Sequence, residues 1–254
     1  METTQAVFAS LAPLGRNVAV IRVDESGLIA VAKPPGMLSH PNKSGEESRA
    51  LLNASYELNG EFYRWTDSHG KERRAWLLNR LDSATSGVML LATNEALARH
   101  IRILFKTKRI QKMYAALVFG RPAQKREVWR DKLAVHKKGG QIRTGGQGNS
   151  PAESEMRWVD TGPHATPPRS LIQLEPRTGR SHQLRVQCAQ RHLPIVGDAT
   201  YGDFRLNREL AKRTGEKRLC LHSFRTSFEY EWEGRRVRFH AEAPLPAEFE
   251  TLLR

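Results

Sequence analysis

The stretch Asn79-Arg80-Leu81-Asp82-Ser83-Ala84-Thr85-Ser86-Gly87-Val88 joins a polar turn to an apolar strand in the middle of the chain. The run Val88-Met89-Leu90-Leu91-Ala92 is short, continuous and bounded by turn residues, which is typical of a buried strand. We therefore expect Asp82 at a turn beside a sheet. On local chemistry alone, an aspartate at such a place is most often a turn former that bonds nearby backbone amides.

The net charge of the chain is strongly positive. Its 254 residues contain 41 Lys and Arg against 27 Asp and Glu, which leaves +14 and a pI near 10.2. This excess favours binding to a polyanion through phosphate contacts and counterion release. A merely basic soluble protein is the alternative, whereas a membrane-surface role would need a basic amphipathic helix that the sequence lacks.

Several classes of protein are excluded by the composition. No run approaches the roughly 18 apolar residues of a membrane helix, and Met1-Glu2-Thr3-Thr4 does not begin a signal peptide. Cys188 and Cys220 are the two cysteines, and they imply no disulfide framework and no zinc site. We expect a cytoplasmic protein without a bound metal.

Apolar patterning divides the chain into short strands and few helices. Runs between turn residues predict strands at residues 18–23, 28–32, 88–92, 112–120, 171–176, 218–230 and 237–239. Helical spacing predicts helices at residues 46–58, 94–108, from about 181, and 206–212. Residues 136–151, which are rich in glycine, predict a flexible loop or hairpin tip, and residues 160–169 a second loop. With no repeat or linker, we expect a lead-in at 1–16 and one domain over 17–254.

The helix at residues 94–108 is the clearest of these predictions. One face carries Leu97, Ile101, Leu104 and Phe105. Thr93 or Asn94 is expected to cap its start, where Glu95 favours the positive end of the helix dipole.

Four separated motifs resemble those of one enzyme family. Arg80-Leu81-Asp82-x-x-Thr85-Ser86-Gly87 resembles the catalytic motif of the RluA-type pseudouridine synthases, which isomerise uridine in RNA. Ile29-Ala-Val-x-Lys33-Pro-x-Gly36, Lys112-x-Tyr114 and Thr178-Gly-Arg-Ser-His-Gln-Leu-Arg185 resemble further motifs in the family order. The family usually has His where this chain has Asn79. The resemblance extends roughly from Leu28 to Pro246.

The resemblance implies an α+β fold. Its core is a mixed, largely antiparallel sheet flanked by helices, with the active site in a central cleft, in agreement with the alternation of short strands and few helices. The chain resembles a minimal member of the family, without the N-terminal S4-like RNA-binding domain that some members carry.

The resemblance also implies the reaction and its residues. The bond between ribose C1′ and uracil N1 is cut, the base rotates, and it is rejoined through C5, which requires no cofactor. Asp82 is the implied nucleophile or base, and whether it attacks C1′, attacks C6 or removes the 2′ proton stays open. Arg185 is its implied cationic partner. Arg80 would enter the RNA helix as the target base flips out, Tyr114 would stack on the uracil, and Leu184 would wall the pocket.

Five more residues are candidates for contact with RNA: Lys33, Asn79, Arg177, Arg180 and His182. Lys33 either faces RNA or braces the active-site loop, and the bracing role is favoured. His182 is expected to be structural or to face RNA, because it lacks the partners that a metal ligand needs.

Two other functions compete with an RNA uridine isomerase. A catalytically silent RNA-binding or ribosome-assembly protein could use the same fold, although Asp82, Tyr114 and Arg185 are all present. A glycosidase is disfavoured, because Asp82 has no matched acid partner in these motifs. Family members act on transfer RNA or large-subunit ribosomal RNA, and the segments 202–211 and 218–222 favour transfer RNA. We expect a monomer.

Overall fold

The computed structural model describes residue 8 and residues 11–138, 141–163 and 165–254, and these form two compact units. Unit 1 comprises residues up to 110 and residues 225–243, and unit 2 comprises residues 111–224 and 244–254. The chain passes from one unit to the other at residues 110–111, 224–225 and 243–244. The prediction of one domain over residues 17–254 stays a prediction.

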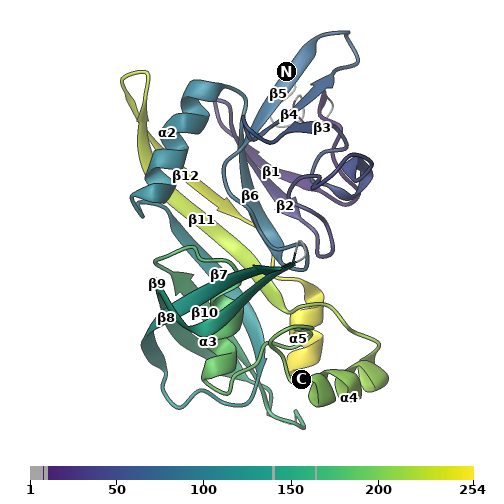
Figure 1. The fold of residues 1–254 in the computed structure, drawn as a ribbon, viewed down its shortest axis with the longest axis vertical. Helices are drawn as coiled ribbons and strands as arrows, with labels where there is room; N and C mark the ends of the chain where they lie inside the picture. The colour runs from purple at the N-terminus through teal and green to yellow at the C-terminus, as the bar shows by residue number, and fades with distance from the viewer. Residues whose placement is uncertain (1–7, 9–10, 139–140, 164) are drawn as a thin grey trace. The chain divides into compact units, whose positions relative to one another are not determined.

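Unit 1 is built on antiparallel strands (Figure 1). In chain order they are β1 (Ala19–Val23), β2 (Leu28–Lys33), β3 (Ser55–Glu57), β4 (Phe62–Thr66), β5 (Glu72–Leu77), β6 (Ser86–Ala92), the 225–232 part of β11 (Leu221–Trp232), and β12 (Arg235–Glu242). Strands β3, β4, β5 and β6 are neighbours in that order, β2 lies between β1 and β6, and β12 pairs with β11. The predicted strand at 88–92 is confirmed as most of β6.

The core of unit 1 is centred on β6 and helix α2 (Glu95–Lys106). Every residue of β6 is buried, because β2 pairs with it and α2 packs against the sheet. Leu97, Ile101 and Leu104 of α2 enter the same cluster as Leu90 and Phe228. Burial of such side chains contributes about 1.5–3 kcal/mol each. The predicted helix at 94–108 is therefore confirmed as a core helix.

The predicted helix at 46–58 is wrong. Its residues form only the short 3₁₀ helix η1 (Glu47–Arg49) and strand β3. Leu51 and Leu52 are both fully buried, but they lie in a segment without helical structure. The Leu51 carbonyl accepts from the Gly15 amide at 2.9 Å, and Leu52 forms a β-bridge with Leu14. Leu58, which the helical pattern placed on the apolar face, is 58% exposed. Long-range pairing overrides the local spacing here.

Strands β4 and β5 were not predicted, because residues 59–75 are mostly polar and charged. They pair as a hairpin in which Tyr63 is fully buried while Arg64 is exposed, a period-two pattern. The described part of the predicted lead-in lies against this hairpin, since the Trp65 indole donates to the Leu11 carbonyl at 2.7 Å.

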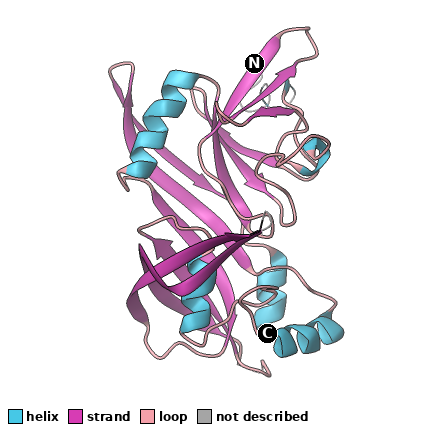
Figure 2. Ribbon diagram, in the orientation of Figure 1, coloured by secondary structure: helices cyan, strands magenta, loops and turns pink. Residues whose placement is uncertain are grey.

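The strands of unit 2 are also antiparallel, and helices lie beside them (Figure 2). Its strands are β7 (Gln111–Phe119), β8 (Arg126–Lys138), β9 (Gln141–Thr161) and β10 (Arg169–Pro176), in the order β7-β10-β9-β8. Its helices are α3 (Gln183–Gln190), α4 (Phe204–Thr214) and α5 (Ala247–Leu253). Helix α3 packs on β8 and β9, and α5 on β10. The C-terminal helix α5 was not predicted.

The described residues of the glycine-rich segment 136–151 belong to the β8–β9 hairpin, which was one of the two predicted alternatives. The register shifts where Leu133 lies opposite Ser150 but Ala134 lies opposite Gly145. Gly148 comes so close there that a Cβ atom would lie 2.3 Å from the Ala134 nitrogen. Glycine thus permits a close approach of two backbones. The predicted loop at 160–169 is shorter than expected, because β9 continues to Thr161.

These elements confirm the predicted α+β fold with a largely antiparallel sheet flanked by helices. No helix in the described part of the chain is long and apolar enough to cross a membrane.

Candidate active site

Asp82 lies in a turn that leads directly into β6. The Thr85 amide donates to the Asp82 carbonyl at 3.0 Å, and β6 begins at the next residue. Such a turn displays the Asp82 side chain at the end of a fully buried strand, and the residue is partly exposed.

Ser39 holds the residue before Asp82. Its hydroxyl donates to the Leu81 carbonyl at 2.7 Å and accepts from the Leu81 amide at 3.1 Å. The Ser39 carbonyl in turn accepts from the Tyr63 hydroxyl at 2.6 Å. All three residues are buried, so these bonds are protected from water. Neither Ser39 nor Tyr63 was predicted for the site, because their partners are remote in sequence.

Lys33 holds the residue after Asp82. Its side chain is buried, and the ammonium donates to the carbonyls of Pro34, Met37 and Ser83 at 3.0, 2.9 and 3.0 Å. The Gly36 amide also donates to the Ser83 carbonyl, at 2.8 Å. These bonds tie the Pro-Gly loop to the turn that carries Asp82. Asp82 therefore lies between two residues whose backbone is held from outside the turn.

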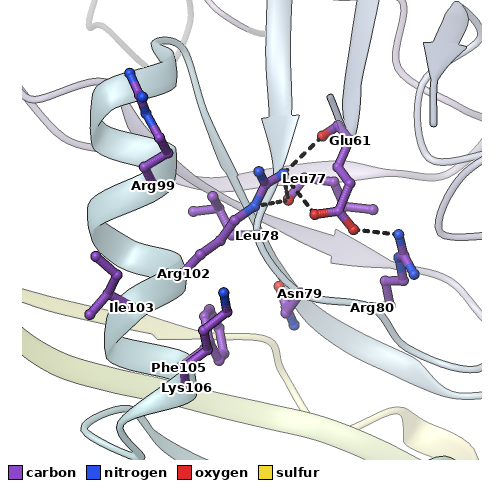
Figure 3. A pocket seen from close by; sticks show the side chains of 10 residues that line it. All are labelled: Glu61, Leu77, Leu78, Asn79, Arg80, Arg99, Arg102, Ile103, Phe105 and Lys106. Atoms are coloured by element: carbon purple, nitrogen blue, oxygen red, sulfur yellow. Dashed lines mark hydrogen bonds and ion pairs between the residues drawn. The ribbon is translucent and has the colours of Figure 1, made fainter. Parts of the chain in front are cut away.

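The first two residues of the motif differ in their surroundings. Asn79 is bonded to β6, because its Oδ1 accepts from the Leu90 amide at 2.8 Å. Arg80 is half exposed, and its Nη2 lies 2.5 Å from Oε1 of Glu61 (Figure 3). Asn79 is thus part of the support for the motif, and Arg80 is at the surface.

In unit 2, Gln183 connects the Thr-Gly-Arg turn to β9. Its Oε1 accepts from the Thr178 hydroxyl at 2.7 Å and from the Arg180 amide at 3.1 Å. Its Nε2 donates to the Glu153 carbonyl at 3.1 Å and to the Ser154 hydroxyl at 2.9 Å. The buried amide therefore sets the turn before α3. This role was not predicted, although Gln183 lies within the quoted motif.

Arg185 forms a bidentate ion pair inside unit 2. Its Nε and Nη2 donate to the two carboxylate oxygens of Asp198 at 2.8 and 2.7 Å, and its guanidinium lies 5.1 Å from the centre of the Tyr201 ring. Both members of the pair are buried. Burial alone would raise the pKa of Asp198, but the hydrogen bonds and charge of Arg185 outweigh it, so the pKa lies below its usual value. The pair uses two of the five N–H donors of the guanidinium and fixes its plane.

His182 and Leu184 flank the start of α3. His182 is in the left-handed conformation, with φ of 55°, and its Nδ1 lies 2.8 Å from the Tyr201 hydroxyl. That hydroxyl also accepts from the Thr144 amide at 2.8 Å. Leu184 is buried. His182 thus helps to join α3 to β9.

The remaining candidates lie on or beside the sheet of unit 2. Tyr114 is opposite Leu174 in the β7–β10 pairing. Arg177 is half exposed, with Nη1 2.8 Å from Glu175 and Nη2 3.7 Å from Glu155. The exposed Arg180 donates from Nε to the Pro151 carbonyl at 3.2 Å.

The candidate residues are divided between the two units. Unit 1 holds Lys33, Asn79, Arg80 and Asp82, and unit 2 holds Tyr114, Arg177, Arg180, His182, Leu184 and Arg185. Among the described residues, no three His, Cys, Asp or Glu side chains gather into a cluster that could hold a metal ion.

Known proteins resemble this chain over most of its length. A family model described as RNA pseudouridylate synthase matches residues 27–190. The tRNA pseudouridine synthase C of Haemophilus ducreyi is 36% identical over 206 residues, which is 77% of this chain and 79% of that protein. The ribosomal large subunit pseudouridine synthase C of Vibrio cholerae is 33% identical, over 70% of this chain and 54% of that protein. The solved structure of human RNA pseudouridylate synthase domain containing 1 superimposes with a TM-score of 0.66 and 25% identity, and covers 93% of this chain and 87% of that one.

Fold, motifs and relatives define an RNA-modifying isomerase of the pseudouridine synthase class. Within that class, the chain belongs to the RluA-type RNA pseudouridylate synthase family. Its partner is RNA.

Proposed function

We propose that Asp82 is the nucleophile or base with which this enzyme converts a specific uridine of a structured RNA to pseudouridine. The proposal rests on the clamp around Asp82, where Ser39 bonds the backbone on one side and Lys33 on the other. A carboxylate held at a fixed place can react without first being ordered. During the reaction the C1′–N1 bond breaks and a C1′–C5 bond forms, while C5 loses its proton and N1 gains one.

Four other residues assist in this proposal. Arg185 is the proposed cationic partner of Asp82, and the ion pair with Asp198 orients its guanidinium. Arg80 enters the RNA helix as the target nucleotide flips out. Tyr114 stacks on the uracil, and Leu184 walls the pocket. Stacking of a base on an aromatic ring contributes roughly 1–3 kcal/mol, comparable to the cost of unstacking the base.

The contacts with RNA are divided among the remaining candidates. Arg177 and Arg180, whose side chains reach the surface, contact the phosphates directly. Lys33, Asn79 and His182 serve RNA binding by holding the loops that meet it, which is supported by their bonds to backbone and to Tyr201.

Transfer RNA is the proposed substrate. The segments 202–211 and 218–222 resemble the branch that modifies the acceptor stem, and several relatives are tRNA pseudouridine synthases C. The proposed enzyme is a monomer, acts in the cytoplasm and needs no cofactor. These three points stay predictions.

Pseudouridine mapping of total RNA, with and without this gene, tests the proposal. A single position should lose its signal in the deletion strain and regain it with the wild type but not with Asp82→Asn. The Asp82→Asn protein should bind the same RNA with unchanged affinity, because the clamp acts through the backbone.

Loss of RNA binding together with activity would contradict the chemical role, since Asp82 would then support the fold. An unchanged map would contradict the proposed reaction, and a lost position in ribosomal RNA would contradict the proposed substrate.

A further inference from the structure

A pocket of about 520 Å³ lies beside the catalytic motif, within unit 1 (Figure 3). It is bordered by the turn before β4, the end of β5, the first two motif residues and one face of α2. Nothing in the proposed reaction uses the α2 side of this pocket.

The pocket is lined mainly by positively charged residues. Glu61 is the single acidic residue in its lining. The basic residues of the lining are Arg80, Arg99, Arg102 and Lys106. Arg99 and Lys106 are exposed, and Ile103 between them is 55% exposed. A concave surface with four cations and one carboxylate attracts an anion.

The Glu61 carboxylate lies between two of these basic residues. Its Oε1 lies 2.5 Å from Nη2 of Arg80, and its Oε2 lies 3.3 Å from Nη2 of Arg102. Figure 3 shows the two arginines meeting Glu61 from opposite sides. Arginines bind a phosphate in the same way, with two guanidinium groups on either side of one anion.

Backbone geometry holds Glu61 in this place. It adopts a left-handed conformation with φ of 54°, which is uncommon for a residue other than glycine. Its carbonyl accepts from the Leu77 amide at 2.8 Å and from Arg102 at 3.1 Å. Arg102 is fixed as well, because it donates to the Leu77 carbonyl at 2.7 Å. A glutamate in a conformation that favours glycine or asparagine suggests that its side chain has a use.

We propose that this pocket binds a backbone phosphate of the RNA, and that the Glu61 carboxylate takes the place of that phosphate in the free enzyme. An incoming phosphate takes the position of the carboxylate beside Arg102 and displaces Glu61, while Arg99 and Lys106 add positive charge along the α2 side of the pocket. The displacement releases Arg80 from its ion pair, so that it is available to the RNA helix. This inference rests on the proposed function, because it assigns Arg80 the same role.

Salt-dependent binding of bulk transfer RNA tests the phosphate site. The double variant Arg99→Gln/Lys106→Gln should bind about tenfold more weakly near 0.15 M salt and show a shallower dependence of log K on log salt, by about 0.7–0.9 for each phosphate that the variant no longer neutralises. Both side chains are exposed, so folding should be retained. Arg64→Gln, which removes an exposed positive charge from β4, is the matched control and should change binding less than twofold.

Removal of the negative charge of Glu61 tests whether its carboxylate competes with the phosphate. Glu61→Gln should tighten RNA binding several-fold, because the phosphate no longer competes with a carboxylate. Glu72→Gln is its control, since Glu72 is an exposed acid paired with Arg74 at 2.7 Å on β5. If both changes tightened RNA binding equally, Glu61 would act only through the net charge of the protein, and its proposed role would be overturned.

The outcomes separate this inference from the proposed function. Wild-type affinity in the double variant would overturn the phosphate site, and a protein partner would then be the better occupant, while the effect of Asp82→Asn on pseudouridine would stand. Weakened RNA binding in the double variant would support the site even if mapping found no modified position.

Discussion

Ser39 is bonded through one hydroxyl to both polar backbone groups of Leu81, the residue before Asp82. Ser39→Ala leaves the buried amide and carbonyl of Leu81 without this partner, which costs about 1–3 kcal/mol of folding free energy. Because the motif then loses its fixed position, we expect kcat to fall at least tenfold while the Kd for RNA is unchanged. Single-turnover kinetics and RNA binding measure the two quantities separately.

Ser26→Ala is the matched control for that prediction. The Ser26 hydroxyl also belongs to a network in unit 1, 2.6 Å from Asp24 and 2.7 Å from the Tyr230 hydroxyl, but it does not contact the motif. It should lower the melting temperature without lowering kcat. An equal loss of kcat in both variants would mean that stability, not position, accounts for the effect.

Asp67 makes the hairpin of β4 and β5 sensitive to acid. A hydrogen bond from Arg73 Nε at 2.7 Å, together with the amides of Lys71 and His69, lowers the pKa of Asp67 to about 2. Since the folded-state pKa is depressed, this stabilisation is present above the unfolded pKa of about 3.9 and is lost as the pH falls toward about 2.

The stability difference between wild type and Asp67→Asn should therefore be constant above about pH 5 and shrink as the pH falls from about 4 toward 2. Denaturant unfolding at several pH values measures it, and an NMR titration of the Asp67 carboxyl checks the pKa directly. A difference that does not change between pH 5 and pH 3 would contradict the assignment.

At the scale of the element, α2 begins as its sequence predicts. Of the two predicted caps, Asn94 is the residue used: its Oδ1 accepts from the Leu97 amide at 2.8 Å. Asn94→Ala should cost about 0.5–2 kcal/mol of stability, measured by denaturant unfolding. Asn94→Asp keeps the acceptor and places a negative charge at the positive end of the helix, so it should retain wild-type stability. Destabilisation by both changes alike would argue against the cap.

At the scale of the whole molecule, the two cysteines are structural. Cys188 and Cys220 are free thiols and fully buried, and burial raises the pKa of Cys220 to about 12 and raises that of Cys188 as well. Since the thiolate is the reactive form, neither should react with a thiol reagent such as DTNB in the folded protein, and both should react once it unfolds. Fast labelling of one cysteine in the native protein would show that its unit opens locally.

Elements with a strong local signal could be predicted from the chain alone. Strand β6 is an apolar run between turn residues, and α2 combines one apolar face with a capping residue. These signals arise from interactions within a few residues, which sequence order records directly. The motif around Asp82 likewise lies within a single stretch, and together with the three other motifs it indicated the family.

Contacts between distant residues were decided only by the tertiary structure. The Ser39–Leu81 bonds join residues 42 apart, and the Lys33–Ser83 bond joins residues 50 apart. The helix expected at 46–58 does not form for the same reason, because pairing of Leu51 and Leu52 with the chain before β1 outweighs their spacing. Such bonds leave no periodic trace in the sequence, since each depends on how the whole unit folds. The surroundings of Asp82 and the Glu61 ion pairs therefore follow from the fold, whereas membership of the family could be predicted from the motifs in the chain.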